Sequence, residues 1–246
     1  MPPPSGRAPP PPGALRLPRD LAPLIDHTLL RPGASEQEAE RWCDEALRHG
    51  FAGVCVRAGH LPRVVRLLSG SAVLPVAVAD FPRGEGTAAT RVREVEEAAA
   101  AGAREIDVVA PLPALHRADW PAVHRDLAAL VRAAGGAGLK VILETCLLTP
   151  ERMAAAAAVA AAAGAAFVKT STGFSSGGAT EEAVRVLREA VGPAVGVKAS
   201  GGIRTAAGAL RLVRAGASGR WRQTAAPRPC PSPHGPNGPP PRRAAR

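Results

Sequence analysis

The sequence is poor in lysine and in aromatic residues. It has three lysines among its 31 basic residues, no tyrosine, and aromatic side chains at only 3% of its 246 positions. So few rings cannot form the stacking surface on which single-stranded nucleic acid is bound, which argues against a nucleic-acid-binding module. Because apolar residues still make up 46% of the chain, we expect a core of valine, leucine, isoleucine and alanine.

The basic excess lies at the two ends of the chain. Residues 1–18 and 219–246 together carry eight arginines and no acidic residue, out of a net charge of +10. The intervening residues 19–218 therefore carry only about +2, which gives them no basic surface for an acidic partner. Each end also holds eight prolines. We predict a disordered tail at each end and one folded domain over residues 19–218.

Motifs for metal sites, disulfide frameworks and membrane spans are absent from the sequence. The four cysteines form no C-x-x-C pair, which favours a reduced, cytoplasmic compartment, and we expect Cys55 and Cys146 to be buried. The six histidines form no H-x-x-x-H or H-E-x-x-H arrangement, so we predict neither a metal nor another cofactor. The longest run of small apolar residues, 154–163, is too short to cross a bilayer, and we expect no membrane partner.

Short apolar runs alternate with amphipathic stretches along the chain. Continuous apolar runs are typical of strands covered on both faces, as in a parallel sheet. The runs that predict strands are 23–27, 52–56, 74–79, 104–109, 139–144, 165–170 and 194–198. The stretches that predict helices are 35–49, 60–69, 87–101, 117–136, 150–163, 180–191 and 205–215. Seven β-then-α units with a period of about 25–30 residues indicate an α/β fold of the TIM (β/α)8 type.

Capping residues mark the expected helix starts. Ser35 with Glu38 has the spacing of a capping box, and Thr149 precedes a proline that suits the first helical position. Thr180 and Thr205 are further N-cap candidates.

An eighth strand is missing from this pattern. Residues 219–246 lack any β-branched apolar run, and their eight prolines are incompatible with a central strand. The composition changes abruptly after Ser218, as it does where GC-rich coding sequence is read out of frame. We therefore expect a barrel without strand 8 and without its closing helix, open between the first and seventh strands.

Two of the three lysines end consecutive predicted strands, in similar surroundings. Lys169 lies in A-F-V-K-T-S-T-G and Lys198 in V-G-V-K-A-S-G-G. Arginine replaces lysine wherever only charge matters, but it cannot lose its proton and attack a carbonyl. We predict that Lys169 is a Schiff-base nucleophile and that the nearby Lys198 ammonium depresses its pKa. The third lysine, Lys140, is expected at the opposite mouth of the barrel with a structural role.

A carboxylate inside an apolar strand must be paired or functional. Asp107 lies in E-I-D-V-V, and we assign it the proton transfers to and from the reacting carbonyl. A core salt bridge to a strand-end cation is the alternative. Asp26, in L-I-D-H-T-L-L, is a weaker case, and we expect it to bind substrate hydroxyls together with Thr28.

Two loops of small residues follow the lysine strands. Ser200, Gly201 and Gly202 precede the helix that Thr205 caps, where backbone N–H groups favour a phosphate. A tight turn is the alternative role for the glycine pair. We also expect substrate contacts from Thr170 and Gly173, which follow Lys169.

These motifs, in this order and spacing, closely resemble those of the deoxyribose-phosphate aldolase family. The resemblance covers about residues 20–218. The segments that carry it are L-I-D-H-T-L-L, V-C-V, E-I-D-V-V, L-K-V-I-L-E-T, F-V-K-T-S-T-G-F and V-G-V-K-A-S-G-G-I-R-T.

The resemblance implies a class I, metal-free aldolase built on a TIM barrel. Such an enzyme cleaves 2-deoxy-D-ribose 5-phosphate to D-glyceraldehyde 3-phosphate and acetaldehyde. Matched by motif, Lys169 is the Schiff-base lysine, Lys198 the partner that lowers its pKa and Asp107 the proton relay. Gly201 and Gly202 match part of the phosphate site.

The chain departs from the family where strand 8 and its phosphate loop belong. One alternative is therefore a C-terminally truncated barrel with impaired catalysis. Another is a different class I sugar-phosphate aldolase, whose donor would be a ketone rather than acetaldehyde. A small sugar phosphate is the expected partner in either aldolase reading, and a homodimer is the assembly we consider.

Overall fold

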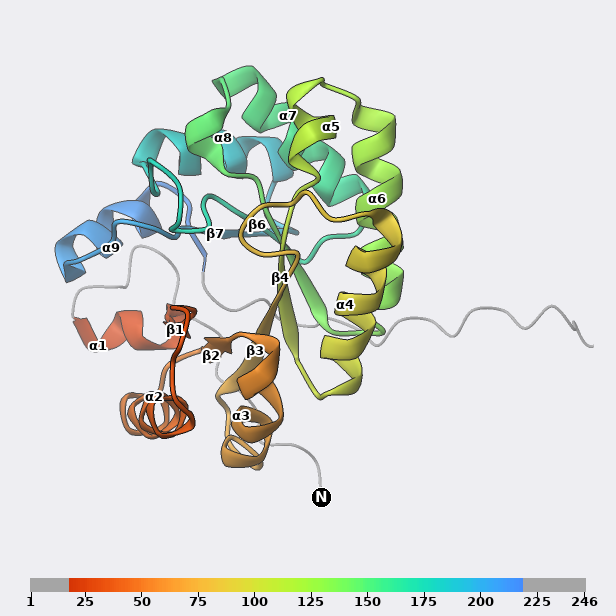
Figure 1. The fold of residues 1–246 in the computed structure, drawn as a ribbon. Coiled ribbons are helices and arrows are strands. Elements are labelled where there is room, and N and C mark those ends of the chain that lie inside the picture. The colour runs from red at the N-terminus through yellow and green to blue at the C-terminus, as the bar shows by residue number, and fades with distance from the viewer. Residues whose placement is uncertain (1–17, 219–246) are drawn as a thin grey trace, which may run out of the picture.

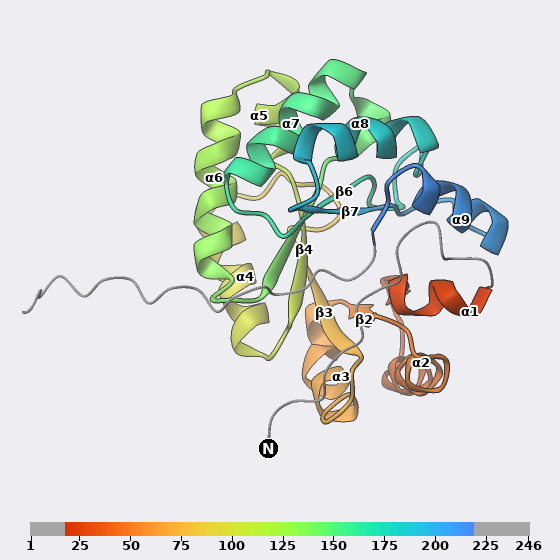
Figure 2. The ribbon, with the colours of Figure 1, turned by 180° about the vertical axis from the view of Figure 1, so that it is seen from behind.

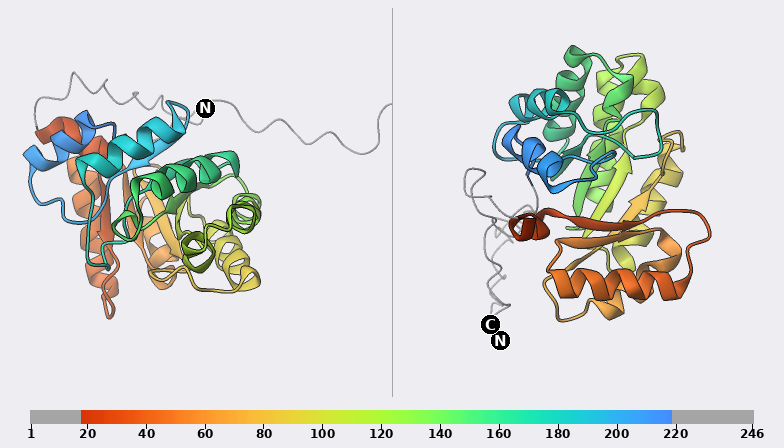
Figure 3. Two further views of the ribbon diagram at one scale, coloured as in Figure 1. Left: turned by 90° about the horizontal axis from the view of Figure 1, so that it is seen from above. Right: turned by 90° about the vertical axis from the view of Figure 1, so that its left-hand side faces the viewer.

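The structure is a computed structural model that describes residues 18–218. Its strands are all parallel and form one sheet in the order β1 to β7, each pairing with its neighbour in sequence. The sheet curls into an incomplete barrel with the helices outside it (Figures 1 and 3). The predicted TIM-type barrel lacking a closing strand is confirmed over this range. The strands are β1 (Asp26–Leu29), β2 (Gly53–Val56), β3 (Leu74–Ala79), β4 (Glu105–Val109), β5 (Gly138–Ile142), β6 (Phe167–Lys169) and β7 (Gly196–Lys198).

Apart from α1, which precedes β1, the helices follow the strands and cover the outer face of the sheet (Figure 3). They are α1 (Pro18–Leu21), α2 (Glu36–His49), α3 (Leu61–Leu67), α4 (Ala88–Ala100), α5 (Leu112–His116), α6 (Trp120–Ala133), α7 (Pro150–Ala162), α8 (Glu181–Val191) and α9 (Ala206–Arg214). Single 3-10 turns are η2 (Ala22–Leu24), η3 (Ala58–His60) and η4 (Thr145–Leu147). Among residues 18–218, every helix is too short or too polar to traverse a lipid bilayer. The predicted tails lie outside the described residues, apart from Pro18, which begins α1.

The predicted caps hold the helix starts. Ser35 and Glu38 form the reciprocal capping box of α2, since each side chain bonds to the other residue's backbone N–H. Thr149, Thr180 and Thr205 each accept a hydrogen bond from the third residue of their helix. Such a cap stabilises a helix by about 1 kcal/mol. Together they fix where each strand-to-helix loop ends, and these loops carry the site described below.

Two boundaries differ from the sequence prediction. The strand expected at 23–27 begins only at Asp26, because Pro23 lies in the 3-10 turn η2. The single helix expected over 117–136 is two helices, α5 and α6. They are separated by Ala118, whose φ of 55° is left-handed, and by Asp119, which caps α6 through the N–H of Ala122.

The barrel is open between β1 and β7, since within residues 18–218 each of them pairs with a single strand. Across this side α1 lies next to α9 (Figures 1 and 2), where Leu21 packs on Val213. An exposed sheet edge usually carries free backbone groups that invite pairing with another strand. Here the outward carbonyls of Leu24, Asp26 and Thr28 accept hydrogen bonds from the side chains of Lys198, Thr28 and Trp42, in that order. Side chains thus cap part of the β1 edge.

Candidate active site

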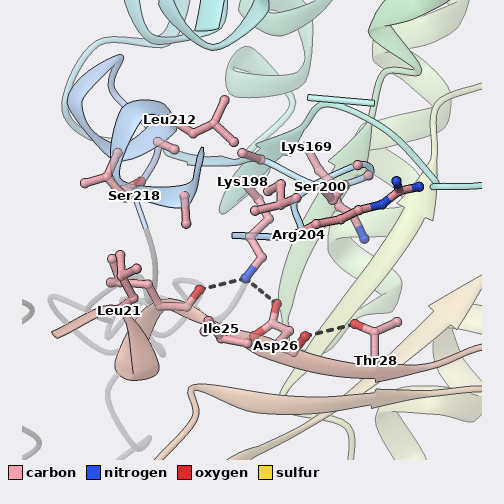
Figure 4. Close-up of a pocket in the computed structure, with 18 of the residues that line it drawn as sticks. Leu21, Ile25, Asp26, Thr28, Lys169, Lys198, Ser200, Arg204, Leu212 and Ser218 are labelled. Carbon is pink, nitrogen blue, oxygen red and sulfur yellow. Dashed lines mark hydrogen bonds and ion pairs between the residues drawn. The ribbon is translucent and has the colours of Figure 1, made fainter. Parts of the chain in front are cut away.

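A cavity of about 560 Å3 opens at the carboxyl ends of β6 and β7 (Figure 4). Lys169 and Lys198 are the last residues of these strands and lie directly opposite each other in the sheet register. Both lysines line the cavity, as does Asp107 from the middle of β4. The three residues that the sequence assigned to catalysis therefore meet in one cavity, at the mouth of the barrel where parallel-barrel enzymes place their reactive groups.

Lys169 is paired with Asp107. Its Nζ donates to Oδ2 of Asp107 over 2.6 Å, and the two residues are only 6% and 1% exposed. Burial by itself lowers the pKa of Lys169, but the Asp107 carboxylate raises that pKa above its ordinary value. The same neighbours act in reverse on Asp107: burial raises its pKa, while Lys140 and Lys169 lower it further, below its ordinary value. At rest, therefore, the pair is an ammonium beside a carboxylate.

Lys198 has a carboxylate partner of its own, and its predicted effect on the pKa of Lys169 stays a prediction. The Nζ of Lys198 donates to Oδ2 of Asp26 over 2.9 Å and to the Leu24 carbonyl over 3.1 Å (Figure 4). Adjacent register places the two lysine backbones side by side, but each side chain bends towards its own carboxylate. The largest charge effect on the pKa of Lys169 comes from the Asp107 carboxylate, which raises it.

Lys140 does not lie at the opposite mouth, so the predicted position of this lysine is wrong. It is the middle residue of β5, 1% exposed, and its Nζ lies 2.5 Å from Glu105 Oε2 and 2.9 Å from Asp107 Oδ1. Asp26 Oδ2 is 3.7 Å away. Burial lowers the pKa of Lys140, but the three carboxylates raise it well above its ordinary value. All three lysines of the chain thus belong to one buried network with Asp26, Glu105 and Asp107.

Asp26 and Thr28 both line the cavity from β1. Burial raises the pKa of Asp26, but Lys198 and Lys140 reverse this effect and hold the pKa far below its usual range. Asp26 is therefore an anion that anchors Lys198. Thr28 is exposed, and its Oγ1 donates to the Asp26 carbonyl over 3.0 Å. Because Asp26 is paired with Lys198 and the Thr28 side chain is exposed, Thr28 is the better placed of the two residues to contact a ligand.

The loop after β7 forms one wall of the cavity through Ser200, Gly201 and Gly202. Gly201 and Gly202 have φ of 83° and 75°, a left-handed conformation that side chains rarely adopt. An added Cβ on Gly201 would also lie 3.0 Å from the Gly178 backbone. The glycine pair is thus required by the turn itself, which brings backbone N–H groups towards the start of α9.

Thr170 and Gly173 lie outside the residues that line this cavity. Thr170 is fully buried, where its Oγ1 accepts from the Ser200 N–H over 3.1 Å and donates to the Ser200 carbonyl over 3.2 Å. It therefore fixes the Ser200 loop from behind. Gly173 is exposed on the loop after β6.

Sequence reasoning missed Arg204 and the parts played by Glu105 and Lys140. Arg204 is exposed and lines the cavity beyond Ser200 (Figure 4). Its position in S-G-G-I-R, two residues after the glycines, was the available signal. Glu105 alternates with Asp107 on one face of β4, and Lys140 is the third lysine of a lysine-poor chain. These two features of the sequence were the available signals that Glu105 and Lys140 lie inside the barrel with Asp107.

The two cysteines near the site differ. Cys55 is buried as expected, and burial with the nearby Asp107 raises the pKa of its thiol to about 12. Cys146 is exposed on η4, contrary to prediction, because the turn points its thiol out towards Ser175. In the part of the chain that the structure describes, no cluster of His, Cys, Asp and Glu could hold a metal ion.

Comparison with known proteins places this geometry in a family. A family model described as DeoC/LacD family aldolase matches residues 21–222. The chain is 47% identical over 194 residues to a deoxyribose-phosphate aldolase of Brevibacillus brevis, covering 79% of this chain and 88% of that protein. It is 45% identical over 201 residues to one of Clostridium perfringens, covering 81% and 90%. A tetrameric deoxyribose phosphate aldolase structure from Aeropyrum pernix superposes with a TM-score of 0.76 at 35% identity, covering 82% and 86%. The chain therefore belongs to the DeoC/LacD family of aldolases.

Proposed function

We propose that this chain is a deoxyribose-phosphate aldolase, a lyase that cleaves 2-deoxy-D-ribose 5-phosphate to D-glyceraldehyde 3-phosphate and acetaldehyde. The observation that carries the proposal is the buried Lys169–Asp107 pair, 2.6 Å apart in a cavity that a small sugar phosphate can enter. The names of the relatives support the choice of substrate. Residues 19–218 are the aldolase domain in this proposal.

Schiff-base formation begins with a proton transfer within this pair. Asp107 takes a proton from Lys169, and the neutral amine attacks the aldehyde carbon C1 of the open-chain sugar. The resulting carbinolamine loses its hydroxyl as water, for which Asp107 returns the proton. The product is an iminium ion on Lys169, which keeps one positive charge beside the Asp107 carboxylate.

Carbon–carbon cleavage then uses the iminium ion as an electron sink. The C3 hydroxyl gives up its proton and becomes the new aldehyde, while the C2–C3 electron pair moves towards the iminium nitrogen. D-Glyceraldehyde 3-phosphate leaves, and an enamine remains on Lys169. Protonation of the enamine carbon and addition of water release acetaldehyde and restore the amine. We assign these proton transfers to Asp107, because its Oδ2 lies against the reacting nitrogen.

The phosphate is assigned to the wall of the cavity opposite β1. Backbone N–H groups of Gly201 and Gly202 precede α9, and an anion is favoured at the N-terminus of a helix. Arg204 adds a guanidinium, which suits a phosphate. Lys198 contributes a second cation between this wall and Asp26.

A barrel with impaired catalysis is the second candidate. It is favoured by the gap between β1 and β7, which no strand fills within residues 18–218 and where an eighth strand would bring a further loop to the phosphate. The two candidates differ in rate, because aldolase-like turnover on the order of 1–100 per second would contradict impairment. The tetramer from Aeropyrum pernix also makes a homo-oligomer our proposed assembly, with the homodimer as its smallest form.

Covalent trapping tests the proposed function. Acetaldehyde with borohydride should add one reduced ethyl group to Lys169, located by peptide mass mapping. Lys169→Arg should lose both the adduct and the cleavage of deoxyribose 5-phosphate, while its circular dichroism spectrum stays that of the parent. An adduct that maps to Lys198 would reverse the assignment, and cleavage without any adduct would exclude the Schiff-base route.

A further inference from the structure

Glu105 is a buried carboxylate that the reaction described above does not use. It begins β4 two residues before Asp107, so both side chains point into the barrel. Glu105 is 8% exposed, and its Oε2 lies 2.5 Å from the Lys140 ammonium. Burial raises the pKa of Glu105, which the Lys140 charge opposes. Burying a charged pair is costly even when the two groups are in contact, so the burial of Glu105 calls for an explanation.

Glu105 is connected to the reactive amine through two further contacts. Lys140 Nζ, held by Glu105, donates to Asp107 Oδ1 over 2.9 Å. The other oxygen of Asp107, Oδ2, accepts from Lys169 over 2.6 Å. Asp107 therefore stands between two ammonium groups that compete for it, and Glu105 holds one of them on its far side.

The charges of this network are balanced. Its carboxylates are Asp26, Glu105 and Asp107, and its ammonium groups are Lys140, Lys169 and Lys198. Loss of any one charge leaves an excess among largely buried groups, where screening by water is weaker than at the surface. The titratable groups that the strands turn towards this interior are Asp26 from β1, Cys55 from β2, Glu105 and Asp107 from β4, Lys140 from β5, Lys169 from β6 and Lys198 from β7.

We propose that Glu105 is a positioning residue that, by holding Lys140, sets how strongly Asp107 retains the proton-bearing Lys169. The importance of this role rests on the Schiff-base function proposed for Lys169. With Glu105 present, the Lys140 ammonium is shared between Glu105 and Asp107, so Asp107 keeps a strong attraction for the Lys169 ammonium. Without the Glu105 charge, Lys140 turns to Asp107 and Asp26, the network has one positive charge too many, and Lys169 gives up its proton more readily.

Reductive methylation of the full chain by formaldehyde and cyanoborohydride tests this role. The rate at Lys169 measures the neutral amine fraction, and with three lysines in the chain each one can be followed by peptide mass. In Glu105→Gln, Lys169 should be methylated about tenfold faster than in the parent between pH 8 and 9. This corresponds to a fall of about one unit in the pKa of Lys169. A rate at Lys169 equal to that of the parent overturns the proposal.

Two further variants separate this role from a loss of packing. Glu105→Gln combined with Lys140→Met removes one charge of each sign, so methylation of Lys169 should return to within about twofold of the parent rate. A double variant as fast as Glu105→Gln shows that the effect does not pass through Lys140. A loosened barrel would instead speed methylation of Lys169 and Lys198 alike, which also overturns the proposal.

Glu105→Asp keeps the charge but shortens its reach to Lys140. Its Lys169 should react faster than in the parent and more slowly than in Glu105→Gln, and a parent-like rate counts against the proposal even if Glu105→Gln fails to fold. The rate of methylation by formaldehyde depends on the protonation of Lys169 and not on which substrate the enzyme cleaves. A chain that cannot cleave deoxyribose 5-phosphate would thus refute the proposed function without deciding the role of Glu105.

Discussion

Lys198, the last residue of β7, forms an ion pair with Asp26, the first residue of β1, in which its Nζ donates to Oδ2 over 2.9 Å. The ion pair crosses the side on which the barrel is open. A second bond from Lys198 to the Leu24 carbonyl, 3.1 Å long, strengthens the link. A residue that the sequence assigned to catalysis thereby also ties the first strand to the last.

Removal of Lys198 should therefore destabilise the fold as well as alter the site. Lys198→Met leaves the buried Asp26 carboxylate with Lys140 alone, at 3.7 Å. We expect a loss of about 2–4 kcal/mol in the free energy of unfolding, measured by urea denaturation. Lys198→Met combined with Asp26→Asn should lose less than Lys198→Met by itself, because no unpaired charge remains. Equal losses in the two variants would show that the pair contributes nothing to stability.

Loss of the Asp107 carboxylate should impair the proton transfers of the cleavage reaction more than the ability of Lys169 to form a Schiff base. Asp107→Asn keeps the shape of the side chain but cannot accept a proton from Lys169. Cleavage of deoxyribose 5-phosphate should fall by about 10²- to 10⁴-fold. Acetaldehyde with borohydride should still label Lys169, because loss of the Asp107 charge lowers the pKa of Lys169 and leaves more of it as the neutral amine. A variant with parent-like turnover would leave Asp107 with a purely structural role.

The buried network should limit stability at both ends of the pH range. The pKa values of Asp26 and Asp107 are depressed in the folded state, so their contribution is complete above their usual value of 3.8 and is lost as the pH falls further. The pKa values of Lys140 and Lys169 are raised, so their contribution is complete below 10.5 and is lost as the pH rises. These four groups should therefore contribute fully between about pH 4 and 10.5, which urea denaturation across this range checks. Asp26→Asn should weaken the acidic decline, and an unchanged decline would exclude Asp26 as its source.

Completing the barrel should improve both stability and phosphate binding. An eighth strand with a Gly/Ser-type loop and a closing helix, grafted after Ser218, would lie between β1 and β7, which have no strand between them within residues 18–218. Ser218 already donates its N–H to the Val197 carbonyl over 2.8 Å, which gives the graft its register. The KM for deoxyribose 5-phosphate should fall by about tenfold or more, with little change for unphosphorylated deoxyribose. A graft in which prolines interrupt the strand is the matched control and should give neither effect.

Local patterns decided most of the secondary structure. The apolar runs predicted each of the described strands to within a few residues, because a strand buried on both faces must be apolar throughout. The caps at Ser35, Thr149, Thr180 and Thr205 held, because a cap depends only on residues three positions apart. The division between α5 and α6 was missed, since a left-handed alanine such as Ala118 has no local signal.

The sequence by itself also determined which residues meet in the cavity, because the carboxyl ends of parallel strands share one mouth of the barrel. Lys169 and Lys198 could be brought together on that ground alone, whereas Asp107 stood out as a carboxylate inside an apolar strand. Only the tertiary structure decided which charge pairs with which. Lys140 lies in the interior and not at the far mouth, and Lys198 bends to Asp26 and away from Lys169. Strand order and register fix backbone positions, but a long lysine side chain can reach several carboxylates, and its choice depends on the whole curved sheet around it.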